Sequence, residues 1–230
     1  MTVRENQAIV IAPRRRGRPQ VRTDEETRAL IVEAASRAFQ SGGYAAACIA
    51  DVAQDAGVST KTLYRLIPTK AALFESVVAA RIDRFVLQID QEVCATCDAA
   101  TVIADLAASY GRFALDPQVA GVNRLVLAEG AQFPEIKSYF YERAVLRVRD
   151  AMARPLARLV ERGLIALDDV KEAAEMLRGM MAMEPQRAMM LGQRERPSEA
   201  EIRARARRCA RFFLDGCAVR ADRAGREPFR

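Results

Sequence analysis

Residues 49–65, IADVAQDAGVSTKTLYR, are the stretch that most constrains how this chain can fold. In its first half, apolar residues recur at i, i+3, i+4 and i+7, which predicts a helix of about two turns with one apolar face. These residues are Ile49, Val52, Ala53 and Ala56. Gly57 can take the left-handed conformation of a sharp turn, and Ser59 is a favourable N-cap for a second helix. The stretch therefore predicts a helix-turn-helix.

The second of these helices is short and polar. Leu63 is its inward-facing residue, and the side chains left facing out are Thr60, Lys61, Thr62, Tyr64 and Arg65. These side chains add little burial, whereas a helix inserted into the major groove would bring them to base edges and phosphates. The same residues are also compatible with an ordinary helical corner of a globular all-α domain.

A longer ordered pattern favours the DNA-reading interpretation. Its residues are Ala34-Ala35, Phe39, Gly43-Tyr44, Asp51-Val52-Ala53, Ala56-Gly57-Val58-Ser59, Thr62-Leu63-Tyr64, Pro68-Thr69-Lys70 and Leu73-Phe74. From Leu30 to Phe74 this pattern resembles the DNA-binding domain of TetR-family transcriptional repressors. The resemblance implies a dimeric regulator, most simply a repressor, that uses Ser59, Thr60, Lys61, Thr62 and Tyr64 at double-stranded DNA. Arg65 and Lys70 would then position the protein on the DNA backbone.

Four positions depart from the family pattern. Ala47-Cys48 stand where hydroxyl residues are usual, so a helix cap that contributes about 1 kcal/mol and a phosphate contact are missing. Leu66 stands where Tyr or His is common, and Lys61 adds a cation where Gly is frequent. An alternative therefore stays open, namely a TetR-like protein that binds a ligand or a partner and has a weakened DNA-reading head.

Residues 1–22 form a basic arm. Six arginines and one glutamate give the arm a net charge of +5, against +6 for the whole chain. Its Arg-Gly-Arg-Pro core resembles the AT-hook, in which extended arginines lie along a narrow minor groove. We expect Arg16 and Arg18 to help position the protein on DNA. The alternative is a tail that only aids solubility, and in both cases we expect it to be disordered without DNA.

Downstream of the reading head the periodicity is helical, with no alternating strand pattern. We expect helices over residues 23–40, 69 to beyond 85, 102–113, 117–131, 134–162, 168–191 with a kink at Pro185, and 197–220. The expected fold is all-α, with a helix-turn-helix domain at 23–68 and a helical-bundle regulatory and dimerisation domain at 69–220. The arm at 1–22 and a polar tail at 221–230 flank them. The segment 124–135 also resembles the regulatory domain of the AefR-like branch.

The regulatory half has more apolar surface than one small bundle needs, including six methionines between residues 176 and 190. Methionine adapts its shape, which suits a ligand pocket or an interface. The resemblance implies a cavity for a small apolar or amphipathic effector. Our candidates for its wall are Leu106, Tyr110, Phe113, Val122, Val126, Glu129, Phe140, Arg143, Met176 and Met180. The apolar ones can equally be plain core, and for Glu129 and Arg143 a structural role is the favoured interpretation.

The last helix has an apolar stripe opposite its arginines. With one residue of the preceding helix, it gives a predicted homodimer interface of Met181, Ile202, Ala206, Cys209, Phe213 and Cys217. In the family, the last two helices of each subunit form a four-helix bundle across a two-fold axis. Such a dimer places its reading heads roughly 34–36 Å apart on a near-palindromic operator. An intramolecular helix pair is the alternative.

The composition argues against an enzyme. The chain has no histidine, which removes the commonest general base and most metal sites, and it has no Gly-rich phosphate loop. We therefore expect no catalytic residue, no metal and no cofactor. Cys94 and Cys97 have the spacing of a redox or zinc pair, but we favour incidental cysteines over a thiol-responsive regulator. No apolar run is long enough to span a membrane and no signal peptide is evident, so we expect a cytoplasmic protein.

Overall fold

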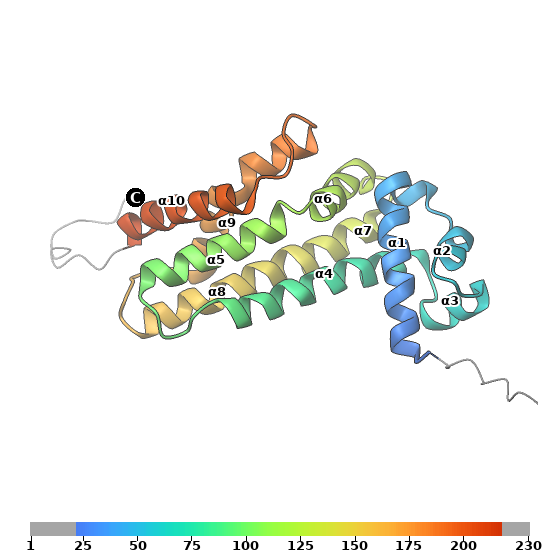
Figure 1. The fold of residues 1–230 in the computed structure, drawn as a ribbon, viewed down its shortest axis with the longest axis horizontal. Coiled ribbons are helices and arrows are strands. Elements are labelled where there is room, and N and C mark those ends of the chain that lie inside the picture. Colours follow the sequence, from blue (N-terminus) through green and yellow to red (C-terminus); the bar gives the residue numbers. More distant parts are fainter. Residues whose placement is uncertain (1–21, 218–230) are drawn as a thin grey trace, which may run out of the picture.

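The structure is a computed structural model that describes residues 22–217, apart from the side chain of Cys217. Within that range the regular elements are all helical, so the expected all-α fold class is confirmed (Figure 1). The elements are α1 (Asp24–Ala46), α2 (Ile49–Asp55), α3 (Thr60–Leu66), α4 (Lys70–Glu92), α5 (Ala99–Ala114), α6 (Pro117–Glu129), α7 (Pro134–Tyr139), the π-helical segment η1 (Phe140–Val145), α8 (Leu146–Glu161), α9 (Val170–Met190) and α10 (Glu199–Cys217). The basic arm with Arg16 and Arg18, and the polar tail, lie outside the described residues.

Helices α1, α2 and α3 form a unit at one end of an elongated molecule, and we call this unit the reading head (Figure 1). Thr23 begins α1 with a capping box, in which its hydroxyl accepts from the N–H of Glu26 at 3.1 Å and its own N–H donates to the Glu26 carboxylate at 2.8 Å. Gly57 makes the turn after α2 with a φ of 68°. Ser59 then caps α3, its hydroxyl accepting from the N–H of Thr62 at 3.0 Å. The predicted helix-turn-helix is therefore present.

Helix α1 runs past the end expected near residue 40, but Gly43 breaks its helical path. Gly43 has φ 78° and ψ 179°, a conformation that favours glycine because it has no Cβ. The backbone N–H groups of Tyr44 and Ala45, just beyond the break, donate to a side chain of α6 instead of continuing the helix. The break thus leaves two backbone N–H groups free to donate hydrogen bonds to α6.

Helix α4 connects the reading head to the rest of the helices, which we call the regulatory part. It starts at the reading head, where the hydroxyl of Thr69 caps it by accepting from the N–H of Ala72 at 3.0 Å, and it then runs beside α5 and α8 (Figure 1). Its apolar face is buried along its length, from Leu73 near the reading head to Ile89 near the far end. One unbroken helix therefore connects the reading head to the regulatory part.

The segment 134–162 is not the single long α-helix that was expected. It consists of α7, the π-helical turn of η1 and α8. A π-helical turn widens the helix locally and is often found at functional sites. Here Phe140, Tyr141 and Ala144 of η1 line a cavity.

Helix α10 packs along α5 of the same chain, which corrects the predicted dimer interface (Figure 1). The apolar stripe of Ile202, Ala206, Cys209 and Phe213 is at most 8% exposed within a single chain. Met181 of α9 is fully buried and lies against Gly111 of α5. These side chains are already covered, so the intramolecular helix pair is the arrangement observed. The side chain of Cys217 is outside the described part of the chain.

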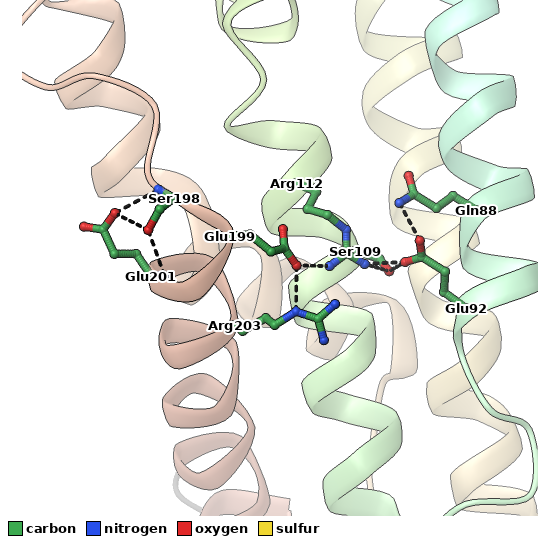
Figure 2. Close-up of polar contacts among 8 residues, drawn as sticks. All are labelled: Gln88, Glu92, Ser109, Arg112, Ser198, Glu199, Glu201 and Arg203. Atoms are coloured by element: carbon green, nitrogen blue, oxygen red, sulfur yellow. Dashed lines mark hydrogen bonds and ion pairs between the residues drawn. The ribbon is translucent and has the colours of Figure 1, made fainter.

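Polar contacts reinforce this packing at the point where α4, α5 and α10 meet (Figure 2). The guanidinium of Arg112 on α5 donates to Glu199 of α10 at 3.0 Å and to Glu92 at the end of α4. The hydroxyl of Ser109 also donates to Glu92, at 2.6 Å. Arg112 therefore bridges the helix that leaves the reading head and the last helix of the chain.

Candidate DNA-reading face and effector cavity

Helix α3 presents a polar outer face over a buried inner one. Leu63 is fully buried and Leu66 nearly so, whereas Thr60, Lys61 and Tyr64 are exposed, Tyr64 to 50%. Thr62 is half-buried, and its hydroxyl lies 2.8 Å from that of Ser59. Ser59 and Thr62 thus contribute to the start of the helix itself. Thr60, Lys61 and Tyr64 are exposed side chains of α3 that another molecule can reach.

Arg65 and Lys70 both have partners within the chain. Arg65 is exposed and forms a two-point ion pair with Asp24, at 2.7 and 2.8 Å, which joins α3 to the start of α1. The Arg65 guanidinium also lowers the pKa of the Asp24 carboxyl. The ammonium of Lys70 donates to the carbonyl of Ala45 at 2.9 Å and lies 5.2 Å from the centre of the Tyr44 ring. An ammonium has three donor hydrogens, so a phosphate contact by Lys70 is still compatible with this bond.

The start of α2 lacks a side-chain cap, as the sequence indicated. Cys48 is the N-cap residue, and no side-chain hydrogen bond caps the helix there. Leu66 and Ile67, at 8% and 1% exposed, are packing residues, so position 66 offers no phosphate contact.

Glu129 does not belong to an effector cavity but to the junction between the two parts. Its carboxylate accepts from the N–H of Tyr44 at 2.9 Å and from the N–H of Ala45 at 2.6 Å. The Tyr44 ring packs against Phe133, just after α6, with ring centres 4.9 Å apart. The structural role favoured for Glu129 is therefore observed, and it joins α6 to the end of α1.

The regulatory part contains a cavity of about 410 Å³ between α4, α5, α6, η1, α8 and α9. Its volume is within the range typical of small-molecule sites. Four of the predicted wall residues line it, namely Tyr110, Phe113, Val122 and Phe140. Its other lining residues are Val78, Arg81, Ile82, Ala114, Val119, Asn123, Tyr141, Ala144, Val145, Val148, Glu175, Arg178, Gly179, Met183 and Gln186.

The other predicted wall residues lie elsewhere. Leu106 and Val126 are core residues, at 0% and 7% exposed, and their faces are covered by neighbouring helices. Met176 is 58% exposed and Arg143 is exposed, both on outer helix faces, while Met180 packs partly buried against the core. Neither these five residues nor Glu129 lines the cavity. Apolar periodicity identified the inward faces but could not tell a cavity wall from close-packed core.

Two arginines of the wall were not predicted. Arg81 of α4 donates to the hydroxyl of Ser36 on α1 at 3.0 Å and lies 4.0 Å from the Asp116 carboxylate; burial lowers the pKa of its guanidinium. Arg178 of α9 lies 5.5 Å from the centre of the Tyr110 ring. Both arginines fall on apolar helix faces, three residues after Val78 and three before Met181. That is the same signal that singled out Glu129 and Arg143.

Cys94 and Cys97 form a disulfide in the loop between α4 and α5, with Cα atoms 5.6 Å apart. The guanidinium of Arg162 donates to the carbonyls of Ala95, Thr96 and Cys97 in the same loop, at 2.9 to 3.1 Å. The two cysteines are thus bonded to each other in this structure. Among residues 22–217, no helix is long and apolar enough to cross a membrane.

Comparisons with known proteins place this geometry in a family. Residues 31–77 match the family model for bacterial regulatory proteins of the tetR family. Residues 101–216 match the model for the C-terminal domain of AefR-like transcriptional repressors. The second match alone covers half of the chain. A comparison with curated proteins gave no match.

Solved structures share the fold over most of the chain. A TetR-family transcriptional regulator from Mesorhizobium loti MAFF303099 is 25% identical, with a TM-score of 0.71 over 86% of this chain and 100% of that one. The flavonoid-responsive regulator FrrA is 24% identical, with a TM-score of 0.67 over 86% and 100% of the two chains. FadR from Bacillus subtilis, solved with stearoyl-CoA, is 18% identical, with a TM-score of 0.64 over 82% and 98%. This chain belongs to the TetR family of transcriptional regulators.

Proposed function

We propose that this protein is a ligand-responsive transcriptional repressor that binds a near-palindromic DNA site as a homodimer. The observation that carries the proposal is the outer face of α3. Thr60, Lys61 and Tyr64 are exposed at the end of the molecule, on a short helix whose apolar side is buried. A helix of this kind can enter a major groove, and hydroxyl, ammonium and phenol groups can contact bases and phosphates there.

Fluorescence anisotropy with labelled duplexes from the DNA flanking the gene of this protein tests the DNA-binding step. We expect salt-dependent binding of a specific duplex. Lys61→Ala should weaken binding and reduce the slope of log K against log salt by about 1, because one cation at the DNA is lost. Lys137→Ala, which removes an exposed lysine of α7, is the matched control and should change neither. Equal binding of all duplexes, or an unchanged slope for Lys61→Ala, would favour the alternative of a weakened reading head.

The path from the cavity to the reading head supports the ligand response. Arg81 lines the cavity and also donates to Ser36 of α1, and it lies on α4, which begins at the reading head. A ligand that prefers one position of α4 by a few kcal/mol is sufficient to change the population of the DNA-binding state. The names of two fold neighbours, a flavonoid-responsive regulator and a regulator solved with stearoyl-CoA, are consistent with small-molecule effectors.

Thiol oxidation is a second candidate signal, which the Cys94–Cys97 disulfide favours. The disulfide closes the loop that joins α4 to α5, so its reduction would loosen this connection. The test compares DNA affinity of the oxidised chain with that of the chain reduced by dithiothreitol. A change of several-fold that disappears in Cys94→Ser would support redox control. Equal affinity of the two forms would exclude it.

A further inference from the structure

Two arginines that line the cavity each have a buried nitrogen without a hydrogen-bond partner among the described residues. Within the described part of the chain, two buried side-chain nitrogens have no hydrogen-bond partner, the Nε atoms of Arg81 and Arg178. Both arginines line the same cavity, which apolar residues otherwise dominate. A buried N–H without an acceptor is unfavourable, and native structures contain few of them. An acceptor from a bound molecule would satisfy both nitrogens, provided that each guanidinium turns its covered Nε edge toward the cavity.

Arg178 has the weaker set of internal partners. One of its terminal nitrogens is 3.5 Å from the carbonyl of Val145, and the face of the guanidinium lies on Tyr110. Within residues 22–217, Arg178 takes part in no ion pair, whereas the Arg81 guanidinium lies 4.0 Å from the Asp116 carboxylate. Glu175 is the acid in the cavity wall, and it is exposed and 3.6 Å from Arg149. The cavity wall thus carries uncompensated positive charge.

We infer that the effector is an amphipathic anion, whose carboxylate or similar acidic group binds Arg178 and Arg81 while its apolar body fills the rest of the cavity. A guanidinium binds a planar carboxylate through Nε and a terminal nitrogen together, and the Nε edge of Arg178 is the one left without a partner. The apolar body would lie against residues such as Ile82, Phe113 and Val148. This inference names the ligand class of the proposed effector site and rests on that proposal.

The link to DNA follows from the second arginine. Arg81 holds Ser36 of α1 and lies beside Asp116, at the start of α6. A carboxylate that binds Arg81 through Nε and the adjacent terminal nitrogen, Nη2, competes for the nitrogen that donates to Ser36. The effector's charge would therefore act directly on a contact between α4 and the reading head, and its apolar body would not.

Isothermal titration calorimetry on the full chain, without DNA, tests the inference with three probes of equal chain length: decanoate, decanol and decylamine. We expect decanoate to bind at least about tenfold more tightly than decanol, and decylamine to bind most weakly. Arg178→Met should reduce the preference for decanoate over decanol to less than about threefold and leave decanol binding unchanged. Retained decanol binding also shows that the variant is folded. Arg178→Lys keeps the charge and should keep part of the preference.

Arg143→Met is the matched control, because it removes an exposed arginine of η1 that does not line the cavity. It should leave all three affinities unchanged. Equal binding of decanoate and decanol, an undiminished preference in Arg178→Met, or no binding of any probe would overturn the inference. Decanoate binding with the expected preference but without DNA release would leave this inference standing and would contradict the proposed ligand-responsive function. The two failures are therefore distinguishable.

Discussion

At the scale of single residues, Cys48 is the position where a small change should stabilise the protein. Its backbone has the extended conformation of an N-cap, with φ −94° and ψ 127°, but no side chain caps α2. Cys48→Ser supplies a hydroxyl acceptor for the free N–H groups of the first turn, which contributes about 1 kcal/mol. For a chain of this size, we expect the melting temperature to rise by roughly 2–4 °C. Cys48→Ala should give no rise in calorimetry, and an equal rise in both variants would contradict the capping explanation.

Variants of Glu129 test a contact between two segments that are far apart in the sequence. Glu129→Ala removes the acceptor for the N–H groups of Tyr44 and Ala45, and we expect a loss of about 1–2 kcal/mol in the free energy of unfolding. Glu129→Gln keeps one side-chain carbonyl, so it should lose less. Urea unfolding followed by circular dichroism measures both. An unchanged midpoint for Glu129→Ala would mean that water replaces the carboxylate without cost.

At the scale of elements, the contact of α4, α5 and α10 predicts a dependence of stability on pH (Figure 2). Burial raises the pKa of Glu92, but hydrogen bonds from Ser109 and Gln88 and the charge of Arg112 outweigh it, so the net effect is a lowered pKa. A carboxyl with a lowered folded-state pKa stabilises the fold above its unfolded-state pKa, which is about 4.3 for Glu. This contribution is then lost as the pH falls through the folded-state value.

We therefore expect Glu92→Gln to melt at a lower temperature than the parent chain at pH 7, and the difference between the two melting temperatures to shrink as the pH falls below the unfolded-state pKa of Glu, about 4.3. Thermal melts at intervals of about one pH unit make the comparison. Asp90→Asn is the control, since Asp90 is half-exposed and has a single ion pair with Arg154 at 3.3 Å. It should have a smaller effect at every pH. A constant difference between Glu92→Gln and the parent across this range would show that the charge of Glu92 is not the cause.

The same scale shows what the sequence could and could not predict. Caps and apolar periodicity are local, so the capping box at Thr23, the turn at Gly57 and the inward side of α3 were all predictable. The partner of an apolar face is not local. The stripe with Phe213 indicated that α10 packs against something, but α5 of the same chain, about a hundred residues earlier, is not encoded in the stripe. Likewise, Glu129 was recognisable as a polar residue on an apolar face, whereas its partners 84 and 85 residues away were not.

The cavity has the same limit. Phe113 and Leu106 both lie on inward faces of α5, yet the first lines the cavity and the second is close-packed. The difference depends on how η1 and α9 are placed against α5, and the π-helical turn that widens η1 has no clear signal in the sequence. Arg81 and Arg178 did have a signal, a cation on an apolar face.

At the scale of the whole molecule, the packing of α10 on α5 leaves the outer side of α10 for the subunit contact that we propose. Phe212 is 69% exposed there, next to Phe213, which is 8% exposed and packs in the core. A subunit contact on this side of α10 would cover the Phe212 ring, and aromatic side chains are enriched in protein interfaces. Phe213 thus contributes to the fold of one subunit, whereas we expect Phe212 to contribute to the contact between subunits.

Phe212→Lys should leave the subunit fold intact and shift the mass found by light scattering from two chains to one, because it places a charge in the subunit contact. Phe213→Ala removes a core side chain and should cost about 3–5 kcal/mol of stability. At concentrations where it stays folded, its mass should remain that of two chains. Since two reading heads on one duplex need two subunits, Phe212→Lys should also lose affinity for a near-palindromic site but keep affinity for a half-site. A parent chain with the mass of one subunit would contradict the dimer, and a dimeric Phe212→Lys would place the subunit contact elsewhere than on the outer side of α10.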